Sequence, residues 1–160
     1  SSAASDVYKR QLEYLGQYIV PFIVDPESGE VIQENFMMTC IALMWVAAIM
    51  SAAIDNIPFT AAMIPIIASL EAVGVNIAAL CWCLAIGVGM GGNGTHIGST
   101  ANVYIVTVSE KLAKTTGNPD LAITPLKWAK KGLPVMVLTL AICTVIMYLF
   151  FDYYSLPLHP

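Results

Sequence analysis

Residues 36–70 decide the fold, and they read FMMTCIALMWVAAIMSAAIDNIPFTAAMIPIIASL. An uncharged apolar run, 36–54, stops at Asp55-Asn56-Ile57-Pro58, and a second apolar run follows over 59–70. At ~1.5 Å of rise per residue the second run covers roughly 18 Å as a helix, well short of a ~30 Å hydrocarbon core. The stretch predicts a helical hairpin over 36–73 with its tip at 55–58. It is either a spanning helix with a short return, or a re-entrant hairpin whose tip lies inside the membrane.

The composition of the whole chain favours the membrane over water. Hydrophobic residues make up 58% of the 160 residues and charged residues 11%, whereas soluble domains have about 45–50% apolar and about 25% charged residues. A soluble protein of this composition would lack polar side chains to cover its surface. No basic stripe with interleaved aromatic residues is present, which argues against nucleic-acid binding. The predicted fold class is therefore an all-α, polytopic, integral membrane protein.

A second interruption lies further along the chain, where residues 91–100 read GGNGTHIGST between apolar runs at 76–90 and 101–108. Glycines and amides inside a hydrophobic stretch predict a broken transmembrane helix over 76–112, unwound at 91–100. Such backbone is tolerated at membrane depth only when it is buried in protein or lines a wet cavity. The alternative is a surface loop carrying an Asn-Gly-Thr glycosylation sequon, which would leave two segments that are each too short to span.

Two other patterns in the apolar runs are expected to carry no chemistry. Residues 87–92 fit the GxGxxG dinucleotide fingerprint, but no strand precedes them, so a nucleotide site is not predicted. The four cysteines have neither CxxC spacing nor histidine partners and are interpreted as small buried hydrophobic residues; they are Cys40, Cys81, Cys83 and Cys143. No cofactor is expected.

The beginning of the chain stands apart from this pattern. Residues 6–11, DVYKRQ, resemble the translation of a transposon-end sequencing adaptor. Residues 1–11 are therefore expected to be an assembly scar outside the fold, which indicates a truncated gene. Residues 12–35 are interpreted as the stump of a truncated helix followed by an acidic loop.

The lysines predict the orientation of the chain. Outside residues 1–11, all lysines and arginines fall between 111 and 131: Lys111, Lys114, Lys127, Lys130 and Lys131. Because positive residues in short loops mark the cytoplasmic side, residues 113–130 are predicted to form a cytoplasmic loop. A final transmembrane helix then covers 131–152, with Pro134 in its first turn. The tail at 153–160 and the acidic loop before residue 36 are both predicted to lie outside. The expected location is a prokaryotic inner or plasma membrane.

Asp55 is the acidic residue that lies inside the apolar stretches between residues 36 and 108. A carboxylate at bilayer depth costs about 2.5–3.5 kcal/mol on insertion scales. It is retained there when it is paired, protonated or holding a cation. The alternative is an ordinary surface turn in which Asp55 caps the following helix.

The two interruptions together predict a site. Each break frees N–H groups at the start of one half-helix and carbonyls at the end of the other, so carbonyls and Asp55 could ligate a cation such as Na⁺, while the half-helix N-termini could face an anionic or polar substrate. The predicted ion- or substrate-binding residues are Asp55, Asn56, Thr60, Gly92, Asn93, Gly94, Thr95, Ser99, Thr100 and Asn102. His96 is a candidate, with Asp55, for proton coupling, unless its ring is simply satisfied by backbone. No metal is expected beyond a transported Na⁺.

At residues 51–65, SAAIDNIPFTAAMIP, and 91–103, GGNGTHIGSTANV, the chain resembles the ion-transporter superfamily. That group includes arsenite-pump membrane proteins, D-type sodium/proton antiporters, P-protein-like carriers and citrate transporters. The resemblance implies one half of an inverted-repeat fold, a homodimer, an elevator-like movement and a site completed by the first repeat. Two positions depart from the pattern. His96 replaces an expected aliphatic residue, and Asp55-Asn56-Ile57 stands where dicarboxylate carriers have Ser-Asn-Thr.

The predicted function is a secondary active ion transporter, either a sodium/proton antiporter or an arsenite or anion efflux protein. A sodium-coupled citrate or dicarboxylate carrier is an alternative, disfavoured because the Asp55 charge would repel the substrate. An intramembrane enzyme using Asp55 and His96 would lack a second acid or a metal pair, and a membrane anchor would gain nothing from broken helices. The expected partners are the lipid bilayer, the N-terminal half of the protein, a transported Na⁺ or H⁺ and a second copy, with no nucleic acid.

Overall fold

A computed structural model describes residues 20–71 and 75–156, and within these residues the regular structure is helical apart from one isolated bridge between Val24 and Val31. The elements are α2 (Gln33–Ala53), α3 (Asn56–Glu71), α4 (Ala78–Gly91), α5 (Thr100–Thr116), the short 3₁₀ helix η1 (Pro119–Leu121), α6 (Pro125–Leu149) and α7 (Phe151–Tyr154). The all-α prediction is confirmed for this part of the chain. The predicted scar at 1–11, the start of the 12–35 segment and the end of the 153–160 tail lie outside the described residues.

Within the described residues, two helical segments are long and apolar enough to cross a membrane, Gln33–Ala53 and Pro119–Leu149. The helices between them are shorter. α3 has 16 residues and α4 has 14, so at ~1.5 Å per residue they extend roughly 24 Å and 21 Å. Large apolar side chains stay exposed on α2, α3, α5 and α6, for example Val46, Ile64, Tyr104 and Leu138. Apolar surface on this scale needs lipid or further protein to cover it.

Helices α2 and α4 form the centre of the bundle because small residues let their backbones meet. A Cβ atom added to Gly87 would overlap the Met44 carbonyl oxygen, and one added to Gly91 would overlap the backbone of Ala48. A glycine at every fourth position is the pattern that brings membrane helices into close contact. Of the glycines in the GxGxxG string, Gly87 thus serves helix packing, whereas a Cβ on Gly89 would meet open space.

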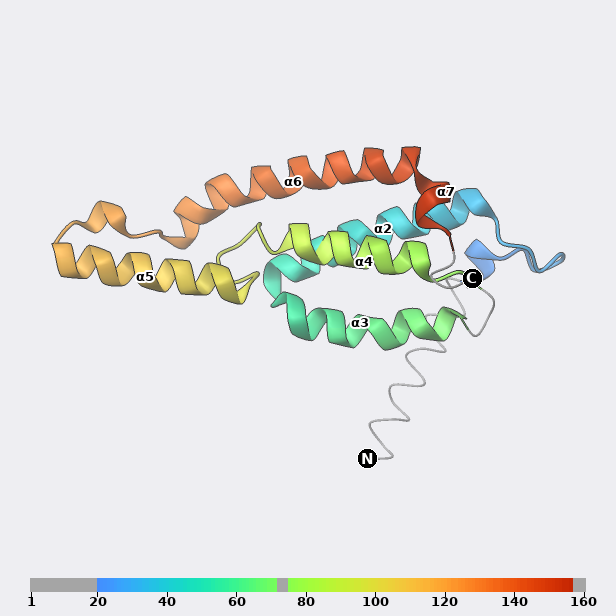
Figure 1. The fold of residues 1–160 in the computed structure, drawn as a ribbon, viewed down its shortest axis with the longest axis horizontal. Coiled ribbons are helices and arrows are strands. Elements are labelled where there is room, and N and C mark those ends of the chain that lie inside the picture. The colour runs from blue at the N-terminus through green and yellow to red at the C-terminus, as the bar shows by residue number, and fades with distance from the viewer. Residues whose placement is uncertain (1–19, 72–74, 157–160) are drawn as a thin grey trace, which may run out of the picture.

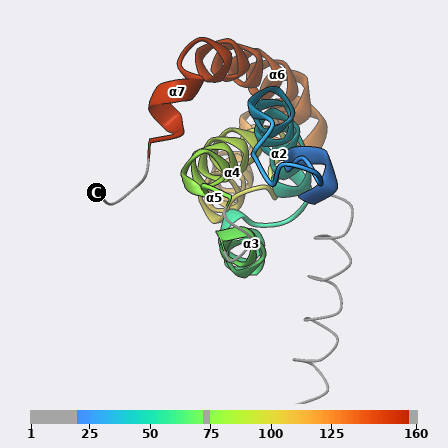
Figure 2. The same ribbon diagram turned by 90° about the vertical axis from the view of Figure 1, so that its right-hand side faces the viewer.

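Helices α3 and α6 flank this pair (Figures 1 and 2). α3 packs on α4 and α6 covers the opposite side of the α2–α4 pair, where the Trp45 indole donates to Thr144 Oγ1 at 3.0 Å. α4 and α5 run in the same direction, one after the other. The α2–α3 turn lies part-way along the molecule, whereas α5 and η1 continue past it (Figure 1).

The C-terminal boundaries correct the sequence prediction. α5 continues to Thr116 and is ended by Gly117, whose φ of 67° suits a residue without a side chain. α6 begins at Pro125 rather than 131, because Thr124 accepts a hydrogen bond from the Lys127 amide at 3.2 Å and caps the helix. Most of the predicted 113–130 loop is therefore helical, and Pro134 lies inside α6 instead of in its first turn.

Candidate functional site

The first break, between α2 and α3, is shorter than predicted. Only Ile54 and Asp55 separate the helices, so the predicted tip at 55–58 is too long, and residues 56–58 belong to α3. The cause is local, because Asp55 Oδ1 accepts a hydrogen bond from the Ile57 amide at 3.3 Å and caps α3. Pro58 fits the first turn, where a missing N–H breaks no intrahelical bond.

The second break, between α4 and α5, spans residues 92–99. Short turn bonds connect it to the end of α4, including Gly94 N to Gly91 O at 2.9 Å. Asn102, in the first turn of α5, directs its Nδ2 to two carbonyls of the unwound segment, Gly92 at 2.8 Å and Thr95 at 3.1 Å. The Asn102 side chain therefore holds the unwound segment against the first turn of α5.

The two breaks are in contact. Thr100, the first residue of α5, donates its hydroxyl to Asp55 Oδ2 at 2.5 Å, and the Thr95 hydroxyl donates to the Ala52 carbonyl at the end of α2. Asp55 thus lies at the N-terminus of α3 and against the N-terminus of α5. Because helix N-termini carry partial positive charge, both helix dipoles stabilise a negative charge at this point.

Asn56 forms the second link between the breaks. Oriented with Nδ2 inward, its amide donates to the Gly98 carbonyl at 2.9 Å and to the hydroxyl of Ser51. Ser51 is fully buried and donates in turn to the Val88 carbonyl of α4 at 2.9 Å. A Cβ at Gly92 would lie 3.0 Å from the Asn56 amide, so only glycine allows this approach without a shift.

The contacts above join Asp55, Asn56, Thr95, Thr100 and Asn102 into one cluster. Three predicted site residues lie away from it. Asn93 is exposed and turns its carbonyl to α6, where the Trp128 indole donates to it at 3.1 Å. Gly94 lies between Ala52 and α6, since a Cβ there would come within 2.6 Å of the Met136 sulfur. Thr60 lines an apolar pocket of about 250 Å³ between α3 and α4.

The remaining two adjoin Thr95 and Thr100 in the sequence. Ser99 and His96 are both half-buried in the unwound segment. Ser99 precedes α5 without capping it through its side chain. The part of His96 in proton coupling stays a prediction.

Ser51, Trp128 and Gly132 contact the breaks although the sequence reasoning did not single them out. Ser51 is one helical turn from the tip, which is a detectable position for a polar residue in an apolar run. Trp128 and Gly132 belong to α6 and reach the site only through tertiary packing, so neither spacing nor composition marks them.

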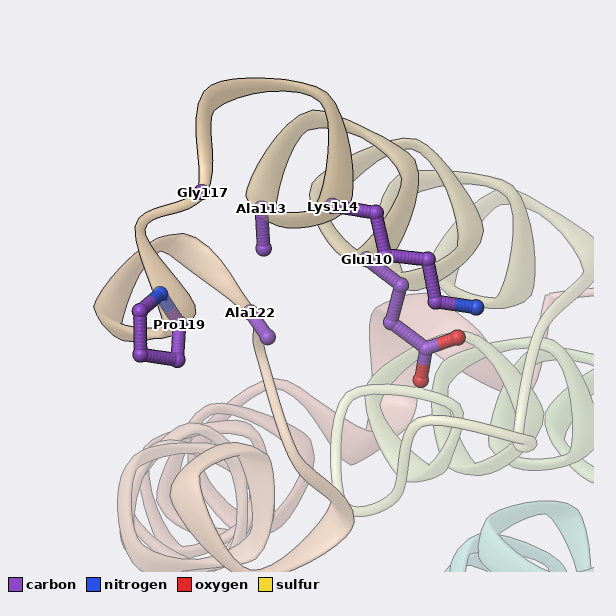
Figure 3. A pocket seen from close by; sticks show the side chains of 6 residues that line it. All are labelled: Glu110, Ala113, Lys114, Gly117, Pro119 and Ala122. Atoms are coloured by element: carbon purple, nitrogen blue, oxygen red, sulfur yellow. The ribbon is translucent and has the colours of Figure 1, made fainter.

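A separate pocket of about 370 Å³ lies at the far end of α5, beside η1. Its lining residues are Glu110, Ala113, Lys114, Gly117, Pro119 and Ala122 (Figure 3). The Glu110 and Lys114 side chains project from neighbouring turns of α5, and the other lining residues contribute little polar chemistry. None of the predicted site residues lies here, so this pocket is distinct from the breaks.

Asp55, the acidic side chain at the breaks, has polar but uncharged partners among the described residues. Within residues 20–71 and 75–156, no three His, Cys, Asp or Glu side chains are grouped to hold a metal ion. In the same part of the chain the side-chain partners of Asp55 are a hydroxyl and a backbone amide, and no basic group pairs with it.

Comparison with known proteins shows several curated relatives. The chain is 34% identical to the P protein of Homo sapiens over 138 residues, which cover 84% of this chain and 15% of that protein. It is 33% identical to a 46 kDa membrane protein of Mycobacterium leprae over 71% of this chain and 25% of the relative. It is 34% identical to an uncharacterized transporter of Mycobacterium tuberculosis over 72% of this chain and 26% of the relative. No protein-family model matches the chain, and no solved structure matches it significantly.

These similarities, together with the apolar helices, support a membrane protein of a transporter family. The chain spans between 15% and 26% of the length of the relatives described above. The names of these relatives state neither a transported substrate nor a coupling ion.

Proposed function

We propose that the chain is the C-terminal part of a secondary active transporter, in which the two breaks form one side of the site for a coupling Na⁺ or H⁺. The observation that carries this proposal is the position of Asp55, whose carboxylate bridges the N-termini of α3 and α5 without a basic partner among the described residues. Acidic residues within membrane segments mark ion pathways and proton relays.

Charge favours a cation or proton over a carboxylate substrate. The positive ends of α3 and α5, which could otherwise bind an anion, are already met by the Asp55 side chain. A citrate or dicarboxylate would encounter a fixed negative charge there. A cation could instead be coordinated by Asp55, by Asn56 Oδ1 and by carbonyls of the unwound segment. An uncharged hydroxide such as arsenite is also compatible with this charge.

The path of the helices supports a re-entrant hairpin. α2 and α3 turn back at Ile54 and Asp55, before the level reached by α5 (Figure 1). The 17 residues of α5 extend roughly 26 Å past the break. Non-helical backbone at this position is tolerated in a membrane if it lines a wet cavity or is covered by protein. We infer that the rest of a longer chain, built as an inverted repeat and assembled as a homodimer, supplies that cover.

The lysines indicate on which side of the membrane the proposed site lies. The unwound segment contacts α6 at Trp128 and Gly132, next to Lys127, Lys130 and Lys131 in the sequence. If these lysines mark the cytoplasmic side, the site in this conformation lies toward the cytoplasm rather than at the midpoint of α6.

Flux measurements in proteoliposomes test the proposal with the full-length protein. Na⁺, H⁺, arsenite and citrate are tested separately as transported species. We expect Na⁺- or H⁺-coupled flux, and a rate about 30-fold lower in Asp55→Asn, as for loss of the interactions of one charged hydrogen-bonding group.

The matched control is Asp120→Asn, which removes an exposed acid of η1 far from the breaks. It should transport at the unmodified rate. Ion-coupled flux at the unmodified rate in Asp55→Asn, with normal insertion, would contradict the role assigned to this carboxylate.

A further inference from the structure

α6 contacts the unwound segment through residues that do not belong to the proposed ion site. The Trp128 indole N–H donates to the Asn93 carbonyl at 3.1 Å. One turn along α6, Gly132 faces the same carbonyl, and a further turn along, the buried Met136 lies against Gly94. One face of α6 therefore lies against residues 93–94 over three successive turns.

The glycine at 132 is required by this contact. A Cβ atom built there would overlap the Asn93 carbonyl oxygen and would lie 3.0 Å from the Trp128 indole nitrogen. Neither neighbour is the far end of a flexible side chain, since one is backbone and the other is a ring nitrogen hydrogen-bonded to that backbone. An alanine at 132 would thus have to push Asn93 away from α6.

The other side of the unwound segment carries the proposed ion site. Gly92 and Gly98 lie against the Asn56 amide, and the Gly92 carbonyl accepts from Asn102. Residues 92–98 are thus held between α6 on one side and the α2–α3 tip on the other. A displacement imposed by α6 is passed directly to the carbonyls that face Asn56.

We propose that Trp128 and Gly132 are positioning residues, which set the affinity for the coupling ion by fixing the unwound segment against α6. The proposal rests on the proposed function, because it assigns the carbonyls of this segment to the ion. Neither residue touches the ion itself. Their effect is therefore expected in the ion concentration for half-maximal flux rather than in the maximal rate.

Two variants with matched controls test this in the full-length protein. Trp128→Phe keeps an aromatic ring but removes the N–H, and the half-saturating ion concentration should rise about fivefold, as for loss of one hydrogen bond. Its control is Trp45→Phe, which also removes an indole hydrogen bond to a neighbouring helix, at 3.0 Å to Thr144, away from the breaks.

Gly132→Ala should raise the half-saturating concentration about tenfold or more, because a displaced backbone alters several ligands together. Its control is Gly89→Ala, since a Cβ on Gly89 in α4 meets open space. Hydrogen exchange of peptides covering 92–99 gives a second readout that does not depend on transport. Exchange should be faster in both α6 variants and unchanged in both controls.

The outcomes separate this proposal from the proposed function. Absence of ion-coupled flux in the unmodified protein would overturn the proposed function. Unchanged exchange of 92–99 in both α6 variants would overturn the positioning role whatever the flux. Equal shifts in Trp45→Phe and Trp128→Phe, or faster exchange with unchanged ion affinity, would also overturn it.

Discussion

The two breaks interrupt apolar helices in opposite ways. Between α2 and α3 only Ile54 and Asp55 leave the helix, and the carboxylate of Asp55 itself caps the next helix through the Ile57 amide. Between α4 and α5 residues 92–99 leave the helix. This longer segment is held by groups from elsewhere, namely Asn102 of α5, the Ala52 carbonyl of α2 and Trp128 of α6.

The difference separates a local break from a tertiary one. The first follows from an N-cap and a proline in the first turn, which act on the chain wherever it lies. The second depends on packing, because its glycines specify no conformation of their own. In the proposed site the short tip supplies the charge of Asp55, and the long segment supplies carbonyls whose positions the neighbouring helices determine.

The largest expected effect comes from the packing that both breaks share. Gly91→Ala places a Cβ against the backbone of Ala48, so α2 and α4 must separate at the level of both breaks. We expect a loss of about 1–3 kcal/mol in the free energy of unfolding, as for other overpacked sites. Reversible unfolding in mixed detergent measures it.

Gly89→Ala is the control on the same helix, and it should be neutral or slightly stabilising because its Cβ meets open space. Equal stability of the two alanine variants would show that α2 and α4 do not meet backbone to backbone.

A smaller effect distinguishes the breaks from each other. Asn102→Ala removes the bonds to the Gly92 and Thr95 carbonyls, and it should cost about 1–2 kcal/mol of stability, as for two ordinary hydrogen bonds. Asp55→Asn should cost less, because asparagine caps a helix as well as aspartate does. The same unfolding assay compares them. A larger loss of stability in Asp55→Asn than in Asn102→Ala would show that the α2–α3 break, rather than the α4–α5 break, depends more on tertiary contacts.

Much of the helical layout follows from the sequence because it depends on local rules. The apolar runs predict α2, α3, α4 and the membrane part of α6, and the glycine cluster predicts the long interruption. The errors occur where capping outweighs composition. Because Asp55 caps α3, residues 56–58 are helical. Because Thr124 caps α6 and Pro125 occupies its first position, α6 begins at Pro125 and includes Lys127, Lys130 and Lys131. Capping preferences could have identified both starts.

The site is less accessible to sequence reasoning. Asp55, Asn56, Thr95, Thr100 and Asn102 were expected near one another, and the structure brings them together. Asn93 and Thr60 were expected there as well, but they face α6 and the α3–α4 groove. Which side of a loop a residue faces depends on tertiary contacts, and these leave no periodic signal in an irregular segment.

Both breaks are proposed to contribute to one ion site. The rate at which a cysteine at position 99 reacts with a water-soluble thiol reagent tests this proposal. The four native cysteines are first replaced by alanine, and Ser99→Cys is chosen because the Ser99 side chain makes no capping bond. The rate is measured as a function of Na⁺ and of pH. The ion that supports flux should slow the reaction, and Asp55→Asn should abolish the slowing. Reaction at the same rate with and without that ion, or equal slowing in Asp55→Asn, would contradict it.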